Sequence, residues 1–527
     1  MNILIKTFII IFFSINLFAE QCEFNFPQVT KNINFTANDF TNNRKNGTLI
    51  INNKIYHFSD TVKLKRGVNK LILNINNCNN EYYIVFSPKM FFRPYITQNS
   101  IEEIEFSRIV NNPIGITNLV DPHTISNSIR ETDPVFDAEI KLGQVFYAQI
   151  LDHDLTSNAQ FQSGPSVNPN RPQNLQSPFL DLDNIYGYGR DTEDTIYKKD
   201  GLRFVLTNNG QDVPRTKDNI ALIPDKRDDI SGLTIQTHIL FMKYHNFLIK
   251  KYLNRVSHKK LNKLQKTWLF EMVRNLVIGA HQGIAINELG PLLTGKKMDL
   301  NQSPLKNIPV EFSAATYRIG HTLVPNEVVI DEQGTKISPL ANGVTKTDPL
   351  RGPNRNNISW KLLLGKNAQP SGRFDDRIAP VMQELIIPIS PTNHDQFKLA
   401  GGEGENIGQG RQVSGTTRLD LVETNILRAR EQNLPSGEEI LAFINQQEYN
   451  PANGNTDLFL FILQEATSNN FKYGKVGTFV FERTIGGMLK ADRYAITKRF
   501  YTRKDKRFFR RIRLEKIVKI SYPKDFR

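Results

Sequence analysis

The 527-residue sequence contains very little cysteine, with Cys22 and Cys78 as its two examples. In an exported chain, an even pair of cysteines suggests one disulfide, which would tie the N-terminal segment together. With both paired, the chain has no cysteine nucleophile and no thiolate ligand for an iron centre. It also has no C-x-x-C-H attachment motif. Any chemistry that the protein performs must therefore use other side chains.

Long apolar runs are also scarce, and no stretch after residue 19 is long and apolar enough to span a membrane. Residues 1–19, MNILIKTFIIIFFSINLFA, have an early lysine, an apolar run and a small residue at Ala19. This pattern predicts a cleavable secretory signal, and an uncleaved anchor is the alternative. No small-residue pair typical of lipid attachment precedes Cys22. We therefore expect a secreted or periplasmic protein.

Acidic residues are few only at one end of the chain. The net charge is +14, and residues 498–527 hold thirteen Lys and Arg against three acidic residues, a net +10. The remainder is close to neutral, so a uniform nucleic-acid-binding surface is not implied, and no specific nucleic acid is expected as a partner. The tail interleaves Arg with Phe and Tyr. It is either a solvated, partly helical extension that closes the domain, or a segment that adheres to an anionic surface.

The pattern of apolar residues changes along the chain. Residues 20–95 contain TLIINNKIYHF, KLILNI and EYYIVF, which read as short strands of a small β-sandwich-like domain. Residues 104–497 carry apolar residues at helical spacing, separated by long Asn-, Pro- and Gly-rich loops. The predicted fold is therefore mainly α, with a signal peptide at 1–19, a β-rich domain before the helical domain, and a basic tail at 498–527.

Four short clusters contain residue types that can act in catalysis or bind a metal or cofactor. In QILDHDL, Gln149 and His153 are four residues apart, so a helix would place them on one face, with Asp154 pointing elsewhere. Taken alone, this cluster also reads as a solvated helix end with a packed histidine. In SPFLDLD, Ser177, Asp181 and Asp183 offer oxygen atoms that suit a hard cation, although turns are generally rich in Asp and Ser.

The remaining clusters are YRIGHTL, which contains His321, and TNILRARE, which contains Asn425, Arg428 and Arg430. Each alone is more often structural than functional. In this order and spacing, however, the four clusters resemble the animal haem peroxidase family of the peroxidase-cyclooxygenase superfamily, whose members include myeloperoxidase and peroxidasin. The resemblance extends over residues 104–498 and includes SPFLDLDNIYG, VEFSAATYRIGH, DLVETNILRARE and GTFVFERTIGGMLKADRY. It also includes Arg227, eleven residues before the histidine of HILFMKYHN. The amino-acid composition and the predicted signal peptide are compatible with a bacterial member of this family.

The resemblance implies a haem b cofactor between two histidines. His153 corresponds to the distal catalytic histidine, accompanied by Arg227 and Gln149, and His321 corresponds to the proximal iron ligand. Asn425 would bind the second nitrogen of His321, and Asp152 corresponds to an aspartate that can be esterified to the haem. Arg318 and Arg428 match arginines near the haem propionates. The family's calcium ligands correspond to Asp154, Ser177, Phe179 through its carbonyl, Asp181 and Asp183.

These roles agree with the chemistry of peroxide cleavage. A neutral imidazole can move a proton between the two oxygens near neutral pH, and a fixed guanidinium stabilises the charge on the departing oxygen. The iron needs one axial nitrogen and one open site. Because Asp154 follows His153 directly, a bound calcium ion would hold the distal helix in place.

The sequence departs from the family at three places. Ile230 stands where a second ester-forming glutamate is usual, and Ser231 stands where myeloperoxidase has methionine. We therefore expect at most one haem ester, through Asp152, and no sulfonium link. The usual R-x-R-D-H-G becomes RAREQN, with Glu431, Gln432 and Asn433. This leaves open how that helix ends.

The function predicted from the resemblance is oxidation of halides, thiocyanate or small aromatic donors with hydrogen peroxide. A fatty-acid dioxygenase of the same superfamily is the first alternative. Those enzymes carry a radical-forming tyrosine three residues before the proximal histidine, where this chain has Arg318, with Tyr317 one position away. A secreted, non-catalytic adhesion or binding protein with a vestigial peroxidase domain is the second alternative.

Overall fold

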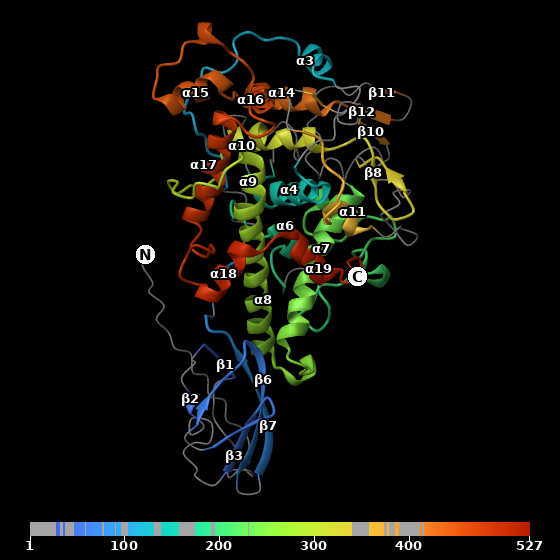
Figure 1. Ribbon diagram of the computed structural model, residues 1–527, viewed down its shortest axis with the longest axis vertical. Coiled ribbons are helices and arrows are strands. Elements are labelled where there is room, and N and C mark those ends of the chain that lie inside the picture. Colours follow the sequence, from blue (N-terminus) through green and yellow to red (C-terminus); the bar gives the residue numbers. More distant parts are fainter. Residues whose placement is uncertain are drawn as a thin grey trace. The chain divides into compact units, whose positions relative to one another are not determined.

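The computed structural model describes most of the chain, and Figure 1 shows its elements in sequence colours. The described residues are 28–31, 35–36, 47–57, 60–75, 78–89, 91–95, 104–130, 139–157, 174–190, 195–229, 231–339, 358–373, 377–378, 385–388, 412–413 and 416–526. They form two compact units. The first takes its described residues from Met1–Arg93, Lys199–Arg203 and Asn246–Asn275, and the second takes its described residues from Pro94–Lys198, Phe204–His245 and Leu276–Arg527.

The first unit is built on a five-stranded sheet of order β1-β7-β6-β3-β4. Its strands are β1 (Val29–Thr30), β3 (Gly47–Ile51), β4 (Lys54–Tyr56), β6 (Gly67–Ile75) and β7 (Cys78–Phe86). All pairs are antiparallel except β1 with β7. Asn52 and Asn53 join β3 to β4 with φ angles of 48° and 67°. Asparagine tolerates this left-handed conformation, which a two-residue hairpin turn requires.

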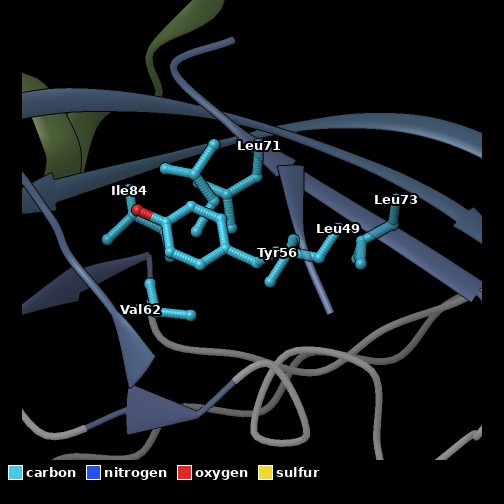
Figure 2. Packing of buried hydrophobic residues seen from close by; sticks show 7 residues of the cluster. Leu49, Tyr56, Val62, Leu71, Leu73 and Ile84 are labelled. Atoms are coloured by element: carbon cyan, nitrogen blue, oxygen red, sulfur yellow. The ribbon is translucent and has the colours of Figure 1, made fainter. Parts of the chain in front are cut away.

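Alternating apolar residues give the first unit a small core. Leu49, Tyr56 and Leu71 meet on one face of the sheet, together with Leu73 and Ile84 (Figure 2). A two-stranded sheet of β2 (Phe35–Thr36) and β5 (Thr61–Val62) adds Val62 to this cluster. The side chain of Asn254 donates to the carbonyl of Val68 at 2.6 Å. The core therefore lies between two small layers of strands, and the turn after α7 (Gly232–Tyr252) is hydrogen-bonded to β6 in the same unit.

The second unit is helical and carries the site. Its elements include α4 (Leu142–Leu155), which lies among the surrounding helices in Figure 1 and is buried along nearly its whole length. Among the described residues, the other helices and helical turns are α3 (Pro122–Ser128), α6 (Asp183–Tyr186), η1 (Asn208–Gly210), η2 (Lys226–Asp229), α7 (Gly232–Tyr252), η3 (His258–Lys260), α8 (Lys263–Ile284), η4 (Ala285–Leu289), α9 (Gly290–Thr294), α10 (Val310–Ala314), η5 (Thr316–Leu323), α11 (Trp360–Leu364), α14 (Leu421–Glu431), α15 (Gly437–Asn445), η6 (Pro451–Asn453), α16 (Leu458–Ser468), α17 (Lys475–Ala491), α18 (Arg503–Arg511) and α19 (Leu514–Ser521).

Short strands complete the second unit. β8 (Val328–Val329) pairs with β9 (Lys336–Ile337), and β10 (Leu385–Pro388) pairs with β12 (Thr416–Leu419), which also pairs with β11 (Gln412–Val413). The predicted fold class, mainly α with a small β-rich N-terminal part, is confirmed. Residues 1–19 and Cys22 lie outside the described residues, so the signal peptide and the disulfide stay predictions.

The basic tail packs into the helical unit rather than extending from it. Phe509 of α18 is fully buried, and its ring and carbonyl lie where side chains on Gly279 and Gly283 of α8 would be. Leu514 and Ile517 of α19 are also fully buried. Close contact at these two glycines lets α18 approach the backbone of α8. The apolar residues of the tail therefore close the helical domain, as one of the two alternatives from the sequence predicted.

Among the described residues, no helix has the length and apolar character needed to cross a membrane.

Candidate active site

The last turn of α4 places three polar side chains in the interior. Asp152, His153 and Asp154 are 6%, 6% and 0% exposed. Helical geometry sends these consecutive side chains in different directions, about 100° apart. The three side chains of this one turn therefore enter three different surroundings. Gln149 lies one turn earlier, on the same face of the helix as His153.

Asp228 holds the ring of His153. Nδ1 of His153 lies 2.7 Å from Oδ1 of this fully buried aspartate. Oδ2 of Asp228 lies 2.6 Å from Nδ1 of His238 on α7, and it also accepts from the amide of Asn184 at 3.1 Å. Sequence analysis did not select Asp228, His238 or Asn184. The signal available for Asp228 was its position directly after Arg227.

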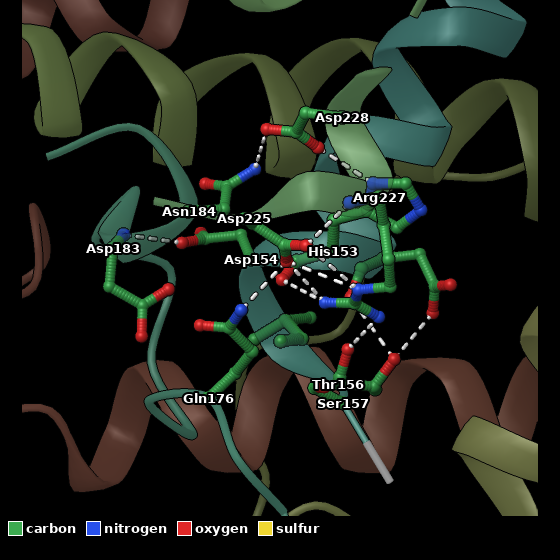
Figure 3. Close-up of polar contacts among 12 residues, drawn as sticks. His153, Asp154, Thr156, Ser157, Gln176, Asp183, Asn184, Asp225, Arg227 and Asp228 are labelled. Carbon is green, nitrogen blue, oxygen red and sulfur yellow. Dashed lines mark hydrogen bonds and ion pairs between the residues drawn. The ribbon is translucent and has the colours of Figure 1, made fainter. Parts of the chain in front are cut away.

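Arg227 is fixed beside the end of α4. Its Nη2 donates to the carbonyl of His153 at 3.0 Å, and its Nη1 donates to the carbonyl of Thr156 at 2.5 Å. Nε and Nη2 also donate to the carboxylate of Asp225 (Figure 3). Although burial opposes it, the negative charge of Asp225 raises the pKa of Arg227. These contacts use four of its five N–H groups and keep a permanent cation next to His153.

Gln149 is oriented by a short chain of hydroxyl groups. Its Oε1 accepts from the hydroxyl of Thr234 at 2.6 Å, and Thr234 in turn lies 2.7 Å from the hydroxyl of Ser231. Because Oε1 is occupied, the amide NH₂ of Gln149 is the group left to face a ligand. Ser231, predicted as a departure from the family, thus takes part in positioning Gln149. Ile230 lies outside the described residues.

His321 lies on η5, and Asn425 of α14 contacts it. Nδ1 of His321 is 2.9 Å from the side-chain amide of Asn425, and Oδ1 of Asn425 is buried with no hydrogen-bond partner among the described residues. Turning the amide by 180° lets Oδ1 accept from Nδ1–H and removes the orphaned acceptor. The ring then has Nε2 as a free lone pair.

The surroundings of His321 favour a neutral ring. Burial, followed by the positive charges of Arg318 and Arg428, lowers the pKa of His321 to about 3. Burial and the charge of Arg318 lower the pKa of Arg428 to about 9. A neutral imidazole is the form that binds a metal, and two neighbouring guanidiniums favour an anionic ligand. This donor set fits a haem with its propionates.

Arg318 also joins this segment to the end of α4. Its Nη1 is 3.4 Å from Oδ2 of Asp152, whose other oxygen accepts from Thr156 at 2.8 Å. Against the effect of burial, the charge of Arg318 lowers the pKa of Asp152. The carboxylate of Asp152, next to His153, is thus an anion, and its partner Arg318 lies three residues before His321 in the sequence.

Asp154 meets Asp181 and Asp183, and one oxygen from each lies within 4.8 Å of the other two. The hydroxyl of Ser177 is 3.2 Å from Oδ2 of Asp181, and the carbonyl of Phe179 accepts from the amide of Asp181 at 2.9 Å. Burial and mutual repulsion raise the pKa of Asp154 and of Asp183 well above their usual values. Oδ1 of Asp183 is buried and has no hydrogen-bond partner in the part of the chain that the structure describes. A divalent cation would neutralise the repulsion between these buried carboxylates and would give the unpartnered oxygen a ligand.

His281 of α8 supports this cluster and was not selected from the sequence. Its Nε2 is 3.0 Å from Oδ2 of Asp154, and its Nδ1 is 3.1 Å from the hydroxyl of Tyr147. Burial lowers the pKa of His281 to about 3, so the ring is neutral. It therefore orients the carboxylate of Asp154 without neutralising the cluster.

The helix that carries Asn425 ends cleanly despite its unusual sequence. α14 ends at Glu431, and Asn433 has a φ of 46°. The amide of Leu434 then donates to the carbonyl of Ala429 at 3.0 Å. Asparagine thus takes the left-handed position that glycine usually occupies after a helix. The departure in RAREQN leaves the position of Asn425 and Arg428 intact.

All the selected residues fall into three neighbouring groups in one helical unit. The first is around His153, the second around His321, and the third around Asp154. A helical fold that brings together two histidines on separate segments, one buried and one partly buried, with arginines and an amide around them, is the arrangement of a haem-dependent oxidoreductase. Residues 159–524 match the animal haem peroxidase family, and the chain belongs to that family. The matched range includes much of the basic tail and begins just after α4.

The relatives of the chain are distant. It is 24% identical over 289 residues to a chorion peroxidase of Drosophila melanogaster, which covers 50% of this chain and 32% of the relative. The chain therefore matches about a third of that relative's length. Fatty acid alpha-dioxygenases of Arabidopsis thaliana and Oryza sativa have similar folds, with TM-scores of 0.52 and 0.54 at 14% identity. The alignments cover 83% of this chain and 78% and 82% of those chains. At this identity they show the fold alone.

Proposed function

We propose that the protein is a secreted haem peroxidase that uses hydrogen peroxide to oxidise halides, thiocyanate or small aromatic donors. The observation that carries this proposal is the pairing of His153 with Arg227. A base whose Nδ1 is held by a carboxylate lies beside a fixed guanidinium, and peroxide cleavage needs both a base and a cation.

A bound haem would supply the iron that accepts the peroxide and the electrons that reduce it. His321 would hold the iron through Nε2, while Asn425 fixes the ring through Nδ1. Nε2 of His153 would take the proton from one peroxide oxygen and deliver it to the other. Arg227 would stabilise the charge on the departing oxygen, and the NH₂ group of Gln149 would orient the peroxide. Arg318 and Arg428 would bind the propionates.

A calcium ion belongs to the same proposal. The buried carboxylates of Asp154, Asp181 and Asp183 are three oxygen donors, and Ser177 and the carbonyl of Phe179 add two more. Calcium accepts six to eight such ligands. The ion would tie the loop of residues 177–183 to the turn of α4 that carries His153.

The function is tested with the purified, haem-loaded protein. Its visible spectrum is recorded with and without peroxide, and the oxidation of iodide, thiocyanate and a phenolic donor is followed. We expect peroxide-dependent turnover that falls about 10²- to 10⁴-fold in His153→Ala. A haem-replete protein that turns over none of these donors would favour the vestigial binding protein instead.

A fatty-acid dioxygenase is the second candidate, because the similar solved structures include such enzymes, one in a complex with palmitic acid. Tyr317 is the tyrosine nearest to His321 in sequence on η5, and its hydroxyl donates to the carbonyl of Ala148 at 3.0 Å. At the position three residues before His321, Arg318 is committed to Asp152. Oxygen consumption with palmitic acid, lost in Tyr317→Phe, would favour the dioxygenase. We expect none.

The basic tail supports a further part of the proposal, adhesion to an acidic lipid surface. Exposed lysines and arginines line the outer side of α18, α19 and the segment before them, and we refer to these residues as the basic face: Arg493, Arg499, Arg503, Lys504, Arg507, Arg510, Arg511, Arg513, Lys516, Lys519 and Lys524. Phe508 is exposed among them. A cationic helix face with an exposed aromatic ring suits the interface of an acidic membrane.

The proposed chain organisation keeps the predicted boundaries. It has a signal peptide at 1–19, a β-rich domain at 20–95, a peroxidase domain at 104–497 and the basic segment at 498–527. Export to the periplasm or the exterior rests on the pattern of residues 1–19.

A further inference from the structure

The three aspartates within two residues of Arg227, at positions 225, 228 and 229, have three different sets of partners. Asp225 pairs with Arg227, Asp229 pairs with Arg215 through two contacts of 2.8 and 2.9 Å, and Asp228 faces two histidines. Two of the three are ion pairs with guanidiniums. Asp228 is the exception, because its nearest donors are imidazole rings and an amide.

The hydrogen bonds around Asp228 define which atoms carry protons. Its two oxygens face Nδ1 of His153, Nδ1 of His238 and the NH₂ group of Asn184. A carboxylate is an acceptor at both oxygens, so each of these neighbours must donate. Both rings then carry a proton on Nδ1, and in the neutral form of each ring the lone pair is on Nε2. Asp228, His238 and Asn184 are each fully buried, so water does not compete for these positions.

We propose that Asp228 is a positioning residue that locks His153 in the Nδ1–H form and so keeps its Nε2 as the proton acceptor. This inference rests on the proposed peroxidase function. His238 and Asn184 hold the second oxygen of Asp228, so the carboxylate cannot rotate away from His153. The family resemblance did not point to it, since no motif selected Asp228.

An asparagine at position 228 would replace a hydrogen-bond acceptor by a donor at one of the two histidines. Asn184 donates to the Oδ2 side, so the amide oxygen of the new side chain would stay on that side, with His238. The NH₂ group would then face His153 and donate to Nδ1. This forces the proton of His153 onto Nε2, where a base is needed. Asp228→Ala removes the constraint without imposing the wrong form, so His153 can sample both.

The test compares Asp228→Asn, Asp228→Ala and the wild type, with Asp229→Asn as a matched control. Asp229 is the next residue, is buried, and binds Arg215 rather than a histidine. The rate constant for reaction with peroxide and the rate of cyanide binding are measured on haem-loaded protein. Cyanide is a useful probe because hydrogen cyanide must give up its proton to a base. We expect a loss of about 10²- to 10⁴-fold in Asp228→Asn, a smaller loss in Asp228→Ala, and little change in Asp229→Asn.

A larger loss in Asp228→Asn than in Asp228→Ala distinguishes a positioning role from a packing role. If Asp228 mattered only for stability, alanine would be worse than the isosteric asparagine. An asparagine variant that reacts like the wild type, or better than the alanine variant, would overturn the proposal. Failure of the wild type itself to react with peroxide would instead overturn the proposed function.

A second measurement does not depend on activity. Nitrogen NMR of ¹⁵N-histidine-labelled protein reports which ring nitrogen carries the proton, and His153→Gln assigns the signal. We expect Nδ1–H in the wild type and Nε2–H in Asp228→Asn. A wild-type signal of the Nε2–H form would overturn the proposal even if the asparagine variant did not fold.

Discussion

Arg318 lies 3.4 Å from Asp152 and thereby joins the segment of His321 to the segment of His153. The two histidines are 168 positions apart in the chain, yet each has a neighbour in this ion pair. The two side chains are 22% and 9% exposed, so solvent screens their attraction less than that of a surface pair. The pair joins the end of α4 to η5, the two elements that carry His153 and His321.

The first prediction concerns His321 as the iron ligand. His321→Ala should lose haem, or lose the high-spin, histidine-ligated visible spectrum. Asn425→Ala should keep haem but shift the spectrum, because the ring loses its partner at Nδ1. His123→Ala is the control, since the side chain of His123 is 55% exposed and lies outside the site. Full retention of haem and spectrum in His321→Ala would reject the assignment.

The second prediction concerns calcium. If the ion binds the native state alone, a concentration 100-fold above its Kd stabilises the protein by about 2.7 kcal/mol. Chelation and Asp181→Ala should therefore both lower the melting temperature and disturb the haem spectrum, because the ion would hold Asp154 next to His153. Asp218→Ala, at an exposed carboxylate, should change neither. If no ion is detected in untreated protein and chelation has no effect, the site does not exist.

The third prediction concerns covalent attachment of haem. Asp152 can form one ester, and the side chain of Ile230 cannot form a second. Mass spectrometry of peptides from the haem-loaded protein, before and after turnover with peroxide, should find one linkage or none. Asp152→Asn should abolish any linkage that the wild type forms. Two protein–haem esters in the wild type would contradict this prediction.

The fourth prediction concerns the basic face. Truncation after Thr497 would remove Phe509 and Leu514 from the core, so it would test folding rather than adhesion. Replacing Arg503, Arg507 and Arg510 with Glu leaves the buried side of α18 intact. This variant should lose salt-sensitive binding to vesicles that contain acidic lipid while keeping peroxidase activity.

The control for the basic face carries the same charge change elsewhere. Lys259, Lys260 and Lys263 are exposed, and their replacement with Glu should leave vesicle binding largely unchanged. Equal loss in both variants would mean that net charge, rather than the basic face, attracts the membrane. Unchanged binding in the α18 variant would show that the segment serves only to close the domain.

The fifth prediction concerns the substrate. Ser231 stands where a methionine would form a positively charged, electron-withdrawing link to the haem, and such a link raises the iron potential. We therefore expect oxidation of iodide, thiocyanate or bromide, and little or no oxidation of chloride near neutral pH. Aromatic donors should react as well, since electrons can enter at the haem edge. Product trapping with each anion in turn, with His153→Ala as control, measures this. Robust chloride oxidation would show that the missing link does not set the potential.

The sequence by itself was sufficient to predict the mainly helical fold, the strands of the β-rich part and the family. These features are local: periodicity of apolar residues defines helices and strands, and Gln149, His153 and Asp154 are recognised within six positions of one another. Expectations for Asn425 and His321 also came from short motifs, and the structure brings their side chains within 2.9 Å.

Tertiary structure decided what the motifs could not. Asp228 and His281 contact His153 and Asp154 from segments 75 and 127 positions away, and no local pattern predicts such contacts. The role of the tail was also undetermined, because a basic amphipathic helix looks alike whether its apolar side meets a core or a membrane. Phe509 packs on two glycines of α8, and that fit depends on the shape of a distant helix. Long-range packing and hydrogen bonding arise only when the folded chain brings remote segments together, which is why they had to be read from the structure.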